Sequence, residues 1–352
     1  MSDNPKEAEK EMDKAIFISA DCWLEVFDLL PRFQLGFGIA LISRRFDHRV
    51  DEHFKTRKWT LNKLKIRSKI GENGAIEMEI VSSKGKAVPT PHYPLPNKVI
   101  GFKRISIDFF DQNVLTFIRR FDRFFATCAT KLFIHNKNVR ISEFVMFTIW
   151  PMLKDTIRLI SLNAIAFRQM RQLDPSMLND CASLRAVVFN FGILPEFPPD
   201  DSANASDGQS VAKWLFTPRH DNLPKLFFVR IENSSVDQWL ATVEHIKAAF
   251  SSASSPIAFV IFIEFPQFLS FPAVVPFKLT NELTGEKLKL SKENANVFAL
   301  IRRPIGGGGG KKWQKEIKKA VEQKNNKIEI SIKGDGVDNG LLDGSPGPSG
   351  DH

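Results

Sequence analysis

The sequence predicts a mixed protein, α+β near its N-terminus and α/β in its larger part. Three observations support this fold class. Residues 18–54 place apolar side chains at helical spacing, residues 59–88 alternate like short strands, and from residue 102 a strand pattern followed by a helical pattern recurs. At 352 residues with 43% hydrophobic side chains, the chain can form a substantial core and has room for two domains.

Residues 18–54 predict three short helices. Asp21 is a good N-cap for the first helix, which ends before Pro31. The second helix carries Leu35, Ile39 and Ile42 on one face but is weakened by two glycines. Ser43 can cap a third helix, in which Phe46, Val50 and Phe54 recur every four residues. A segment this short cannot bury enough surface to be stable alone. We therefore expect it to pack against a partner.

This arrangement resembles an F-box, the adaptor-binding module of SCF ubiquitin ligases. The similarity rests on the apolar residues of the first helix, on Leu30-Pro31 with Leu35 after it, and on the run Ile42-Ser43-Arg44-Arg45-Phe46. Ser19 stands where the family usually has proline, and the second helix is one residue longer than usual. The alternative is an ordinary amphipathic helical hairpin. The resemblance implies that a Skp-type adaptor contacts Ile18, Trp23, Leu24, Val26, Phe27, Leu30, Pro31 and Leu35.

The larger part of the chain contains a loose repeat of the form apolar-x-x-apolar-x-apolar. Its central residues Ile105, Leu132, Ile160 and Val187 are 27, 28 and 27 residues apart, followed by Val229 and Val260 at wider intervals. Alternation of strands with helices predicts parallel strands joined by helical crossovers. The region resembles leucine-rich repeats but lacks their regular asparagine, so an irregular α/β layer is the alternative. On the repeat geometry, we expect a target-binding row formed by Ser106, Phe133, Ser161, Val188, Arg230 and Ile261.

The connecting segments complete the predicted organisation. We expect a disordered leader at 1–16, the F-box-like unit at 17–56, a β-meander with a proline-rich connector at 57–100, and the repeat region at 101–303. Residues 191–209 predict a surface loop, either a plain insertion or a binding loop. We expect a hairpin turning at Thr284-Gly285 and a strand from Val297 to cap the layer. Residues 304–352 predict a glycine linker, a short basic helix and a disordered tail that the fold does not need.

Composition indicates an intracellular protein, in the cytoplasm or nucleus. Three scattered cysteines do not form a disulfide framework, and neither a secretory signal nor a membrane span is recognisable. The net charge is +9, of which residues 302–333 carry +7 and residues 334–352 carry −4. The remaining chain therefore carries an ordinary +6, which makes a nucleic-acid partner unlikely. A nucleic-acid- or chromatin-associated protein that uses the basic tail is the alternative function.

The sequence contains no recognisable catalytic or metal-binding pattern. The glycine run before Lys311 lacks the spacing of a phosphate-binding loop, His48 and His53 lie five residues apart, and no nucleophile–base pair is visible. We therefore expect neither a cofactor nor enzymatic activity. The resemblance implies a substrate-recognition subunit of an SCF-type E3 ligase, linked through the adaptor to a cullin-RING ligase and holding a target protein in its repeat region.

Overall fold

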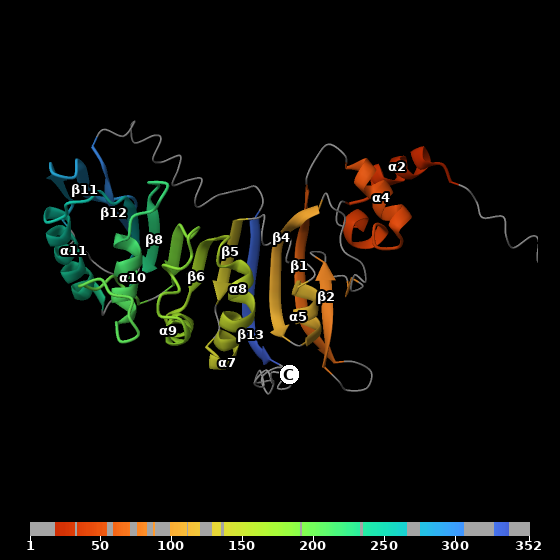
Figure 1. The fold of residues 1–352 in the computed structure, drawn as a ribbon, viewed down its shortest axis with the longest axis horizontal. Helices are drawn as coiled ribbons and strands as arrows, with labels where there is room; N and C mark the ends of the chain where they lie inside the picture. Colours follow the sequence, from red (N-terminus) through yellow and green to blue (C-terminus); the bar gives the residue numbers. More distant parts are fainter. Residues whose placement is uncertain are drawn as a thin grey trace, which may run out of the picture. The chain divides into compact units, whose positions relative to one another are not determined.

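The fold was analysed in a computed structural model (Figure 1). It describes residues 18–31, 34–54, 59–70, 76–82, 87–88, 99–110, 112–119, 129–134, 137–190, 192–232, 235–265, 275–305 and 327–337. The expected leader, the proline-rich connector, the glycine run and the basic helix lie outside these residues. The chain divides into two compact units, one of residues 1–61 and 89–100 and one of residues 62–88 and 101–352.

The first unit contains three helical segments, α2 (Ala20–Leu29), the π-helical turn η1 (Leu35–Ile39) and α4 (Arg44–His53). The first helix begins one residue before Asp21, because the Ser19 hydroxyl accepts the Cys22 N–H and caps it. Its end is set by Leu30, which precedes proline and is extended, with φ −94° and ψ 140°. Ser43 caps α4 as expected, accepting the Phe46 N–H at 3.4 Å.

A small core holds these segments together. Phe27, Leu35, Ala40 and Val50 are at most 3% exposed. Between α2 and α4, the Trp23 ring meets that of Phe46 edge-on, with centroids 4.9 Å apart. We call these segments, residues 18–31 and 34–54, the N-terminal helical unit.

The second unit is built on one mixed β-sheet. Its described strands run in the order β10-β11-β12-β9-β8-β7-β6-β5-β13-β4-β1-β2-β3. Five consecutive strands pair in parallel as predicted: β5 (Ala129–Ile134), β6 (Ile157–Leu162), β7 (Ala186–Phe189), β8 (Lys225–Arg230) and β9 (Phe259–Glu264). The helices between them are α7 (Val139–Phe144), η2 (Val145–Ile149), α8 (Trp150–Leu153), α9 (Ala164–Leu173), α10 (Asp207–Phe216) and α11 (Val236–Ser251).

One face of the parallel strands packs against these helices, several of which Figure 1 shows in front of the strands. The register aligns Leu132, Ile160, Val187, Phe227 and Ile261, and all five are 0% exposed. Ring contacts tie this face to the helices, since Phe189 of β7 lies 5.0 Å from Phe167 of α9. We call this the helix-covered face and the opposite one the second face.

Antiparallel strands extend both ends of the sheet. At one end, β10 (Phe277–Asn281), β11 (Glu286–Lys292) and β12 (Val297–Pro304) form the expected hairpin and strand, and β12 pairs with β9. At the other end lie β1 (Trp59–Ile70), β2 (Ile76–Ser82), β3 (Ala87–Val88) and β4 (Val99–Phe110), with α5 (Gln112–Arg119) after them. The meander therefore belongs to the same sheet as the parallel strands.

The C-terminal segment differs from the expectation of a disordered tail. Residues Lys327–Val337 form β13, which lies in parallel between β4 and β5. The sequence carries the reason, because Ile328, Ile330 and Ile332 alternate with polar residues as in a strand. Their register partners on β5 are Thr130, Leu132 and Ile134, so the three isoleucines occupy positions of the helix-covered face.

Candidate functional site

The N-terminal helical unit keeps several apolar side chains out of its core. Leu29 is 84% exposed, Ile42 60%, Val26 42% and Ile18 39%. Their exposure follows from the size of the unit, because α2 and α4 have only ten residues each and enclose few side chains. Leu29 is the last residue of α2, and Ile42 precedes the Ser43 cap of α4.

The structure divides the predicted adaptor-binding residues into three groups, buried, half-buried and exposed. Phe27 and Leu35, both expected from the sequence to contact the adaptor, are 1% exposed and belong to the core of the unit. Ile18, Val26 and Pro31 are exposed, while Trp23, Leu24 and Leu30 are half-buried. Sequence reasoning assigned Leu29 and Ile42 no contact, although Leu29 precedes the matching Leu30 and Ile42 begins the matching run that ends at Phe46. We call Ile18, Val26, Leu29, Pro31 and Ile42 the apolar patch.

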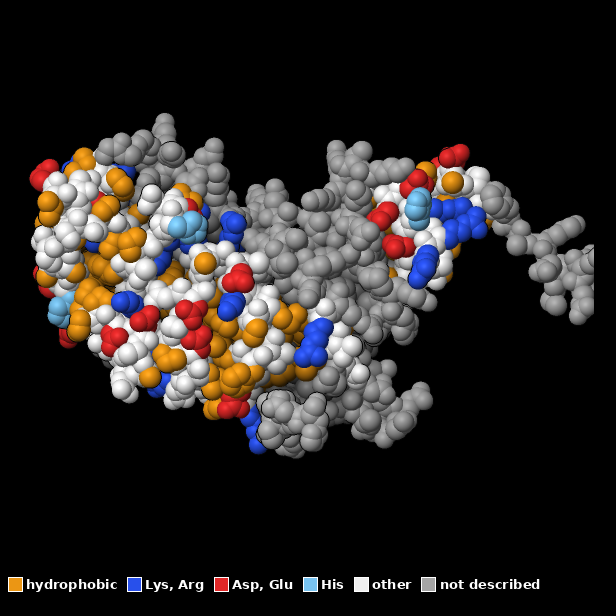
Figure 2. Space-filling model, in the orientation of Figure 1, with side chains coloured by type: hydrophobic (Ala, Val, Ile, Leu, Met, Phe, Trp, Pro, Cys, Tyr) orange, Lys and Arg blue, Asp and Glu red, His pale blue; other side chains and the backbone are white. Residues whose placement is uncertain are grey.

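Charged side chains accompany this patch. Arg44 and Arg45 in the first turn of α4 are exposed, and Figure 2 shows basic side chains, in blue, on the surface of this unit. His53, at the end of α4, is half-buried, with its Nε2 atom 3.4 Å from an Asp28 carboxylate oxygen. The His53 ring also packs edge-on against Phe27 at 5.8 Å, which connects the end of α4 to the last turn of α2.

A row of side chains crosses the second face of the sheet. Strand register aligns Phe133, Ser161, Val188, Phe228 and Phe262, and Ser331 of β13 connects the row to Ser106 of β4. Four of the six residues predicted from the sequence therefore do lie in register: Ser106, Phe133, Ser161 and Val188.

Two members of the predicted row are wrong. Ile261 lies on the helix-covered face, 0% exposed, because the true register shifts β9 by one residue and so exchanges its faces. Arg230 lies on the second face but two residues beyond the row. Phe228 and Phe262 occupy the two positions instead.

Phe133, Val188, Phe228 and Phe262 are the apolar, half-buried members of the row, whereas Ser161 between them is 3% exposed. The rings of Phe228 and Phe262 stack with centroids 4.8 Å apart and planes inclined by 11°. These two rings, together with Phe133 and Val188, pack against a buried cluster on the same sheet. The cluster consists of Leu159, Ala186, Leu226 and Val260. Beyond Phe228, the exposed Arg230 guanidinium forms an ion pair with Glu264 at 2.8 Å. This face therefore offers aromatic and branched side chains with a charged pair at one end.

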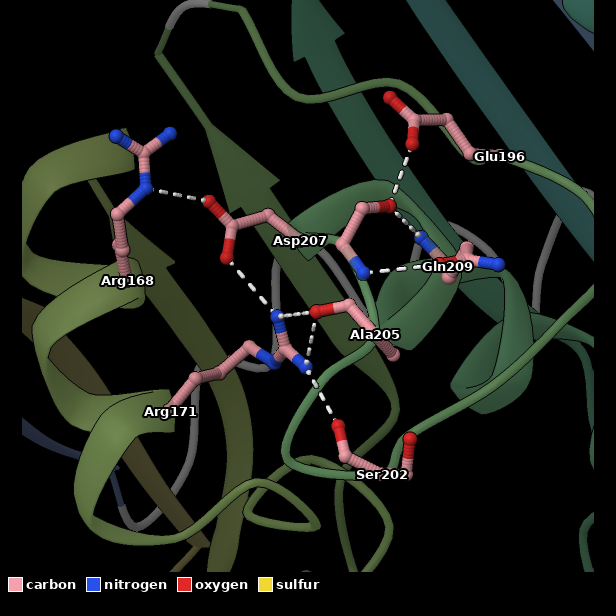
Figure 3. Close-up of polar contacts among 8 residues, drawn as sticks. Arg168, Arg171, Glu196, Ser202, Ala205, Asp207 and Gln209 are labelled. Atoms are coloured by element: carbon pink, nitrogen blue, oxygen red, sulfur yellow. Dashed lines mark hydrogen bonds and ion pairs between the residues drawn. The ribbon is translucent and has the colours of Figure 1, made fainter.

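The expected loop at 191–209 is held by a buried arginine (Figure 3). Arg171 of α9, 6% exposed, donates to the Asp207 carboxylate at 3.0 Å and to the carbonyl oxygens of Ser202 and Ala205. Arg168, one turn earlier on α9, donates to the other Asp207 oxygen at 3.0 Å. Because charged hydrogen bonds converge on two carbonyls and one carboxylate, the loop has a defined conformation.

The end of this loop forms the start of α10. Ser206 and Gln209 make a capping box, and the Ser206 hydroxyl also donates to Glu196. Gly208 is required here, since a Cβ atom would lie 2.5 Å from the Leu194 carbonyl oxygen. The Ser-x-x-Gln spacing was the sequence signal for this helix start, and it lies inside a stretch whose Asp, Ser and Gly residues suggested only loop.

Lys225 is a buried cation on the helix-covered face. It is 5% exposed, donates to the Trp214 carbonyl oxygen, and its Nζ atom lies 5.1 Å from the centre of the Trp214 ring. Burial, together with the nearby charge of Arg219, lowers the Lys225 pKa from 10.5 to about 7. The side chain is therefore partly neutral near pH 7.

Neither a metal site nor a membrane span is present among the described residues. Within them, no three metal-ligating side chains of His, Cys, Asp or Glu come together, and no helix is both long and apolar enough to span a bilayer. Burial, with Asp180 nearby, raises the pKa of the Cys181 thiol, which stays protonated at neutral pH. Arg302, counted from the sequence in the basic tail, is 1% exposed and paired with Glu286.

Comparisons with known proteins assign no family to this chain. No protein-family model, no curated protein and no solved structure matches this chain.

Proposed function

We propose that the N-terminal helical unit is an F-box-type module that binds a Skp-type adaptor, and that the chain serves as the substrate-recognition subunit of an SCF-type E3 ubiquitin ligase. The observation that carries this proposal is the apolar patch, above all Leu29 at 84% exposure. Val26 and Leu29 lie three residues apart on α2 and so expose neighbouring apolar side chains, which on a small unit is typical of a protein interface.

The packing of the unit supports a role in binding. Its core, formed around Phe27, Leu35 and Val50, already holds α2, η1 and α4 together, so the patch is not needed for internal packing. Covering a leucine side chain that is now exposed contributes ~1.5–3 kcal/mol. A partner with an apolar groove would thus stabilise both itself and this unit.

The sheet unit would supply target recognition. We infer that its parallel strands and helices form an irregular leucine-rich-repeat-like layer and that Phe133, Val188, Phe228 and Phe262 contact an apolar part of the target. Arg230 and Glu264 at the end of the row would add polar selectivity. Ubiquitin transfer would be carried out by the E2 enzyme on the cullin-RING arm, so this chain would contribute positioning.

The adaptor proposal is tested by co-purification with a Skp-type adaptor. Leu29→Ala combined with Ile42→Ala should weaken binding at least about thirtyfold, the equivalent of ~2 kcal/mol for removal of interface anchors. Both side chains are largely exposed, so circular dichroism should remain that of the wild type. A matched control, Glu25→Ala with His48→Ala, changes exposed polar residues of the same helices and should bind normally. Equal binding by both double variants, or none by the wild type, would overturn the proposal.

The target surface is tested separately. Phe228→Ser with Phe262→Ser removes the stacked pair and should lose proteins that co-purify with the wild type while the adaptor is retained. The control is Phe147→Ser, a ring 71% exposed on η2, which should retain them. If the same proteins remain bound to the row variant, recognition uses another surface.

The nucleic-acid alternative gains no support from the described residues. Arg302 forms a buried ion pair, and Lys327 and Lys333 belong to β13. The basic stretch on which that alternative depended is thus partly incorporated into the sheet.

A further inference from the structure

The C-terminal strand interrupts an otherwise sequential series. From β5 to β9 each strand pairs with the next one in the chain. β4 and β5 are also consecutive in the chain, yet β13 lies between them and is parallel to both. The sheet therefore contains a slot bordered by β4 and β5 and filled by a segment from the other end of the chain.

The slot selects its occupant by backbone pairing and by the alternation of apolar and polar residues along the strand. Residues Lys327 to Ile332 pair with β5, but on the β4 side pairing shifts register between Ile332 and Gly336. Only the stretch from Ile330 to Ile332 pairs on both sides. The recognised pattern is hence short, with branched apolar residues at positions of the helix-covered face and polar residues between them.

The connection to β13 does not restrict it to this place. Pro304 ends β12, and β12 and β13 are separated by β9, β8, β7, β6 and β5, six steps of ~4.8 Å or about 29 Å along a flat sheet. Residues 306–326 can span up to about 70 Å at ~3.3 Å each. The tether therefore permits β13 to leave and return, and its length, on the scale of the required span, gives a local concentration of order mM.

We propose that the slot between β4 and β5 is a binding site for an extended peptide segment of a partner protein, and that β13 is its tethered internal occupant. The partner segment carries Ile or Val at alternating positions and lies parallel to β4 and β5, adding main-chain hydrogen bonds on both sides. This inference goes beyond the proposed function, because it concerns the sheet and does not require adaptor binding by the N-terminal helical unit.

The experiment exchanges the occupant in the full chain. A protease recognition sequence is inserted after Gly310 and cleaved in the folded protein, which leaves β13 bound without its tether. A fluorescein-labelled peptide with the sequence of 327–337 is then added, and its uptake is followed by anisotropy. The cleaved protein should incorporate the peptide, and the uncleaved protein should take up at least about a hundredfold less at micromolar peptide, because its tethered strand competes at millimolar local concentration.

Specificity is tested with a second peptide containing Ile330→Pro. Ile330 pairs with Ile105 on one side and Leu132 on the other. Proline removes its N–H and is poorly tolerated inside a sheet, so this peptide should bind at least about a hundredfold more weakly. In the peptide-loaded protein, hydrogen exchange should show that the backbone amides of β4 and β5 are protected.

Three results would overturn the proposal. The first is no uptake by the cleaved protein, and the second is equal uptake by the cleaved and uncleaved proteins. The third is the formation of dimers that exchange β13 between copies while excluding the peptide, which would assign the slot to a second copy of this chain.

Discussion

Replacing one member of the buried Arg302–Glu286 pair should destabilise the sheet unit far more than replacing both. Arg302 on β12 donates from Nη2 and Nε to Glu286 of β11 at 2.6 and 3.0 Å, and both side chains are 1% exposed. Further hydrogen bonds hold the pair: Nη2 also donates to the Ser255 carbonyl, and the Ile257 N–H donates to Glu286 at 2.9 Å. The pair thereby joins the terminal hairpin to the segment between α11 and β9.

The size of the effect follows from the charge left behind. Glu286→Leu leaves a buried guanidinium with one carbonyl partner, which costs ~3–5 kcal/mol. At ~2–4 °C per kcal/mol for a domain of this size, the melting temperature should fall by about 6–20 °C. In Glu286→Leu with Arg302→Met no charge remains buried, so at least half of the loss should be recovered, although the Ile257 N–H stays unpaired at ~1–3 kcal/mol.

Urea unfolding of the wild type, both single variants and the double variant forms a double-mutant cycle. We expect a coupling free energy of at least ~2 kcal/mol between Arg302 and Glu286. If the two single losses simply add in the double variant, the charges are independent and the reasoning is wrong. The exposed pair Arg230–Glu264 provides a matched control on the same sheet, for which the same cycle should give below ~1 kcal/mol.

Two further substitutions test the loop and the buried lysine. Gly208→Ala should destabilise the protein by ~1–3 kcal/mol and accelerate protease cleavage within 191–209, because its Cβ would lie 2.5 Å from the Leu194 oxygen. The control is Gly38→Ala, whose Cβ would meet nothing within 4 Å and which should be neutral or stabilising by up to ~1 kcal/mol. Equal protease sensitivity of the two variants would contradict the close approach at Gly208. Lys225 has a folded-state pKa of about 7 against 10.5 ordinarily, so between these values the unfolded chain binds more protons and stability should rise with pH by ~1.4 kcal/mol per unit. Lys225→Met should remove this slope from denaturation curves at pH 7.5–9.5 and should be more stable than the wild type at pH 7.5; an unchanged slope would show that the lysine is not desolvated.

The parallel strands were predictable because their apolar pattern recurs, but the register was predictable only in part. The first four triplets align as expected from their spacing around Ile105, Leu132, Ile160 and Val187. In β8 and β9, apolar residues occupy both faces, as in Phe227-Phe228 and in Val260-Ile261-Phe262. Periodicity cannot choose a register when both faces are apolar, which is why Arg230 and Ile261 were assigned incorrectly to the row.

Capping residues were a stronger local signal than apolar spacing at the ends of helices. Ser43 was identified from the sequence, and the capping box of Ser206 and Gln209 could have been. The position of β13 could not be derived from its own residues, because the alternating isoleucines specify a strand but not its neighbours. Pairing across about two hundred residues of sequence is decided by which inner slot remains unfilled.

The slot between β4 and β5 stays open while the rest of the chain is being synthesised. The chain leaves the ribosome N-terminus first, and roughly 190 residues separate the end of β5 at Ile134 from the start of β13 at Lys327. At ~5–20 residues per second, β4 and β5 therefore exist for about 10–40 s before their shared neighbour has been made. Throughout that time two inner strands present unpaired backbone groups, the feature that promotes pairing with other chains. A premature stop before Lys327 would give an almost complete polypeptide that never leaves this exposed condition.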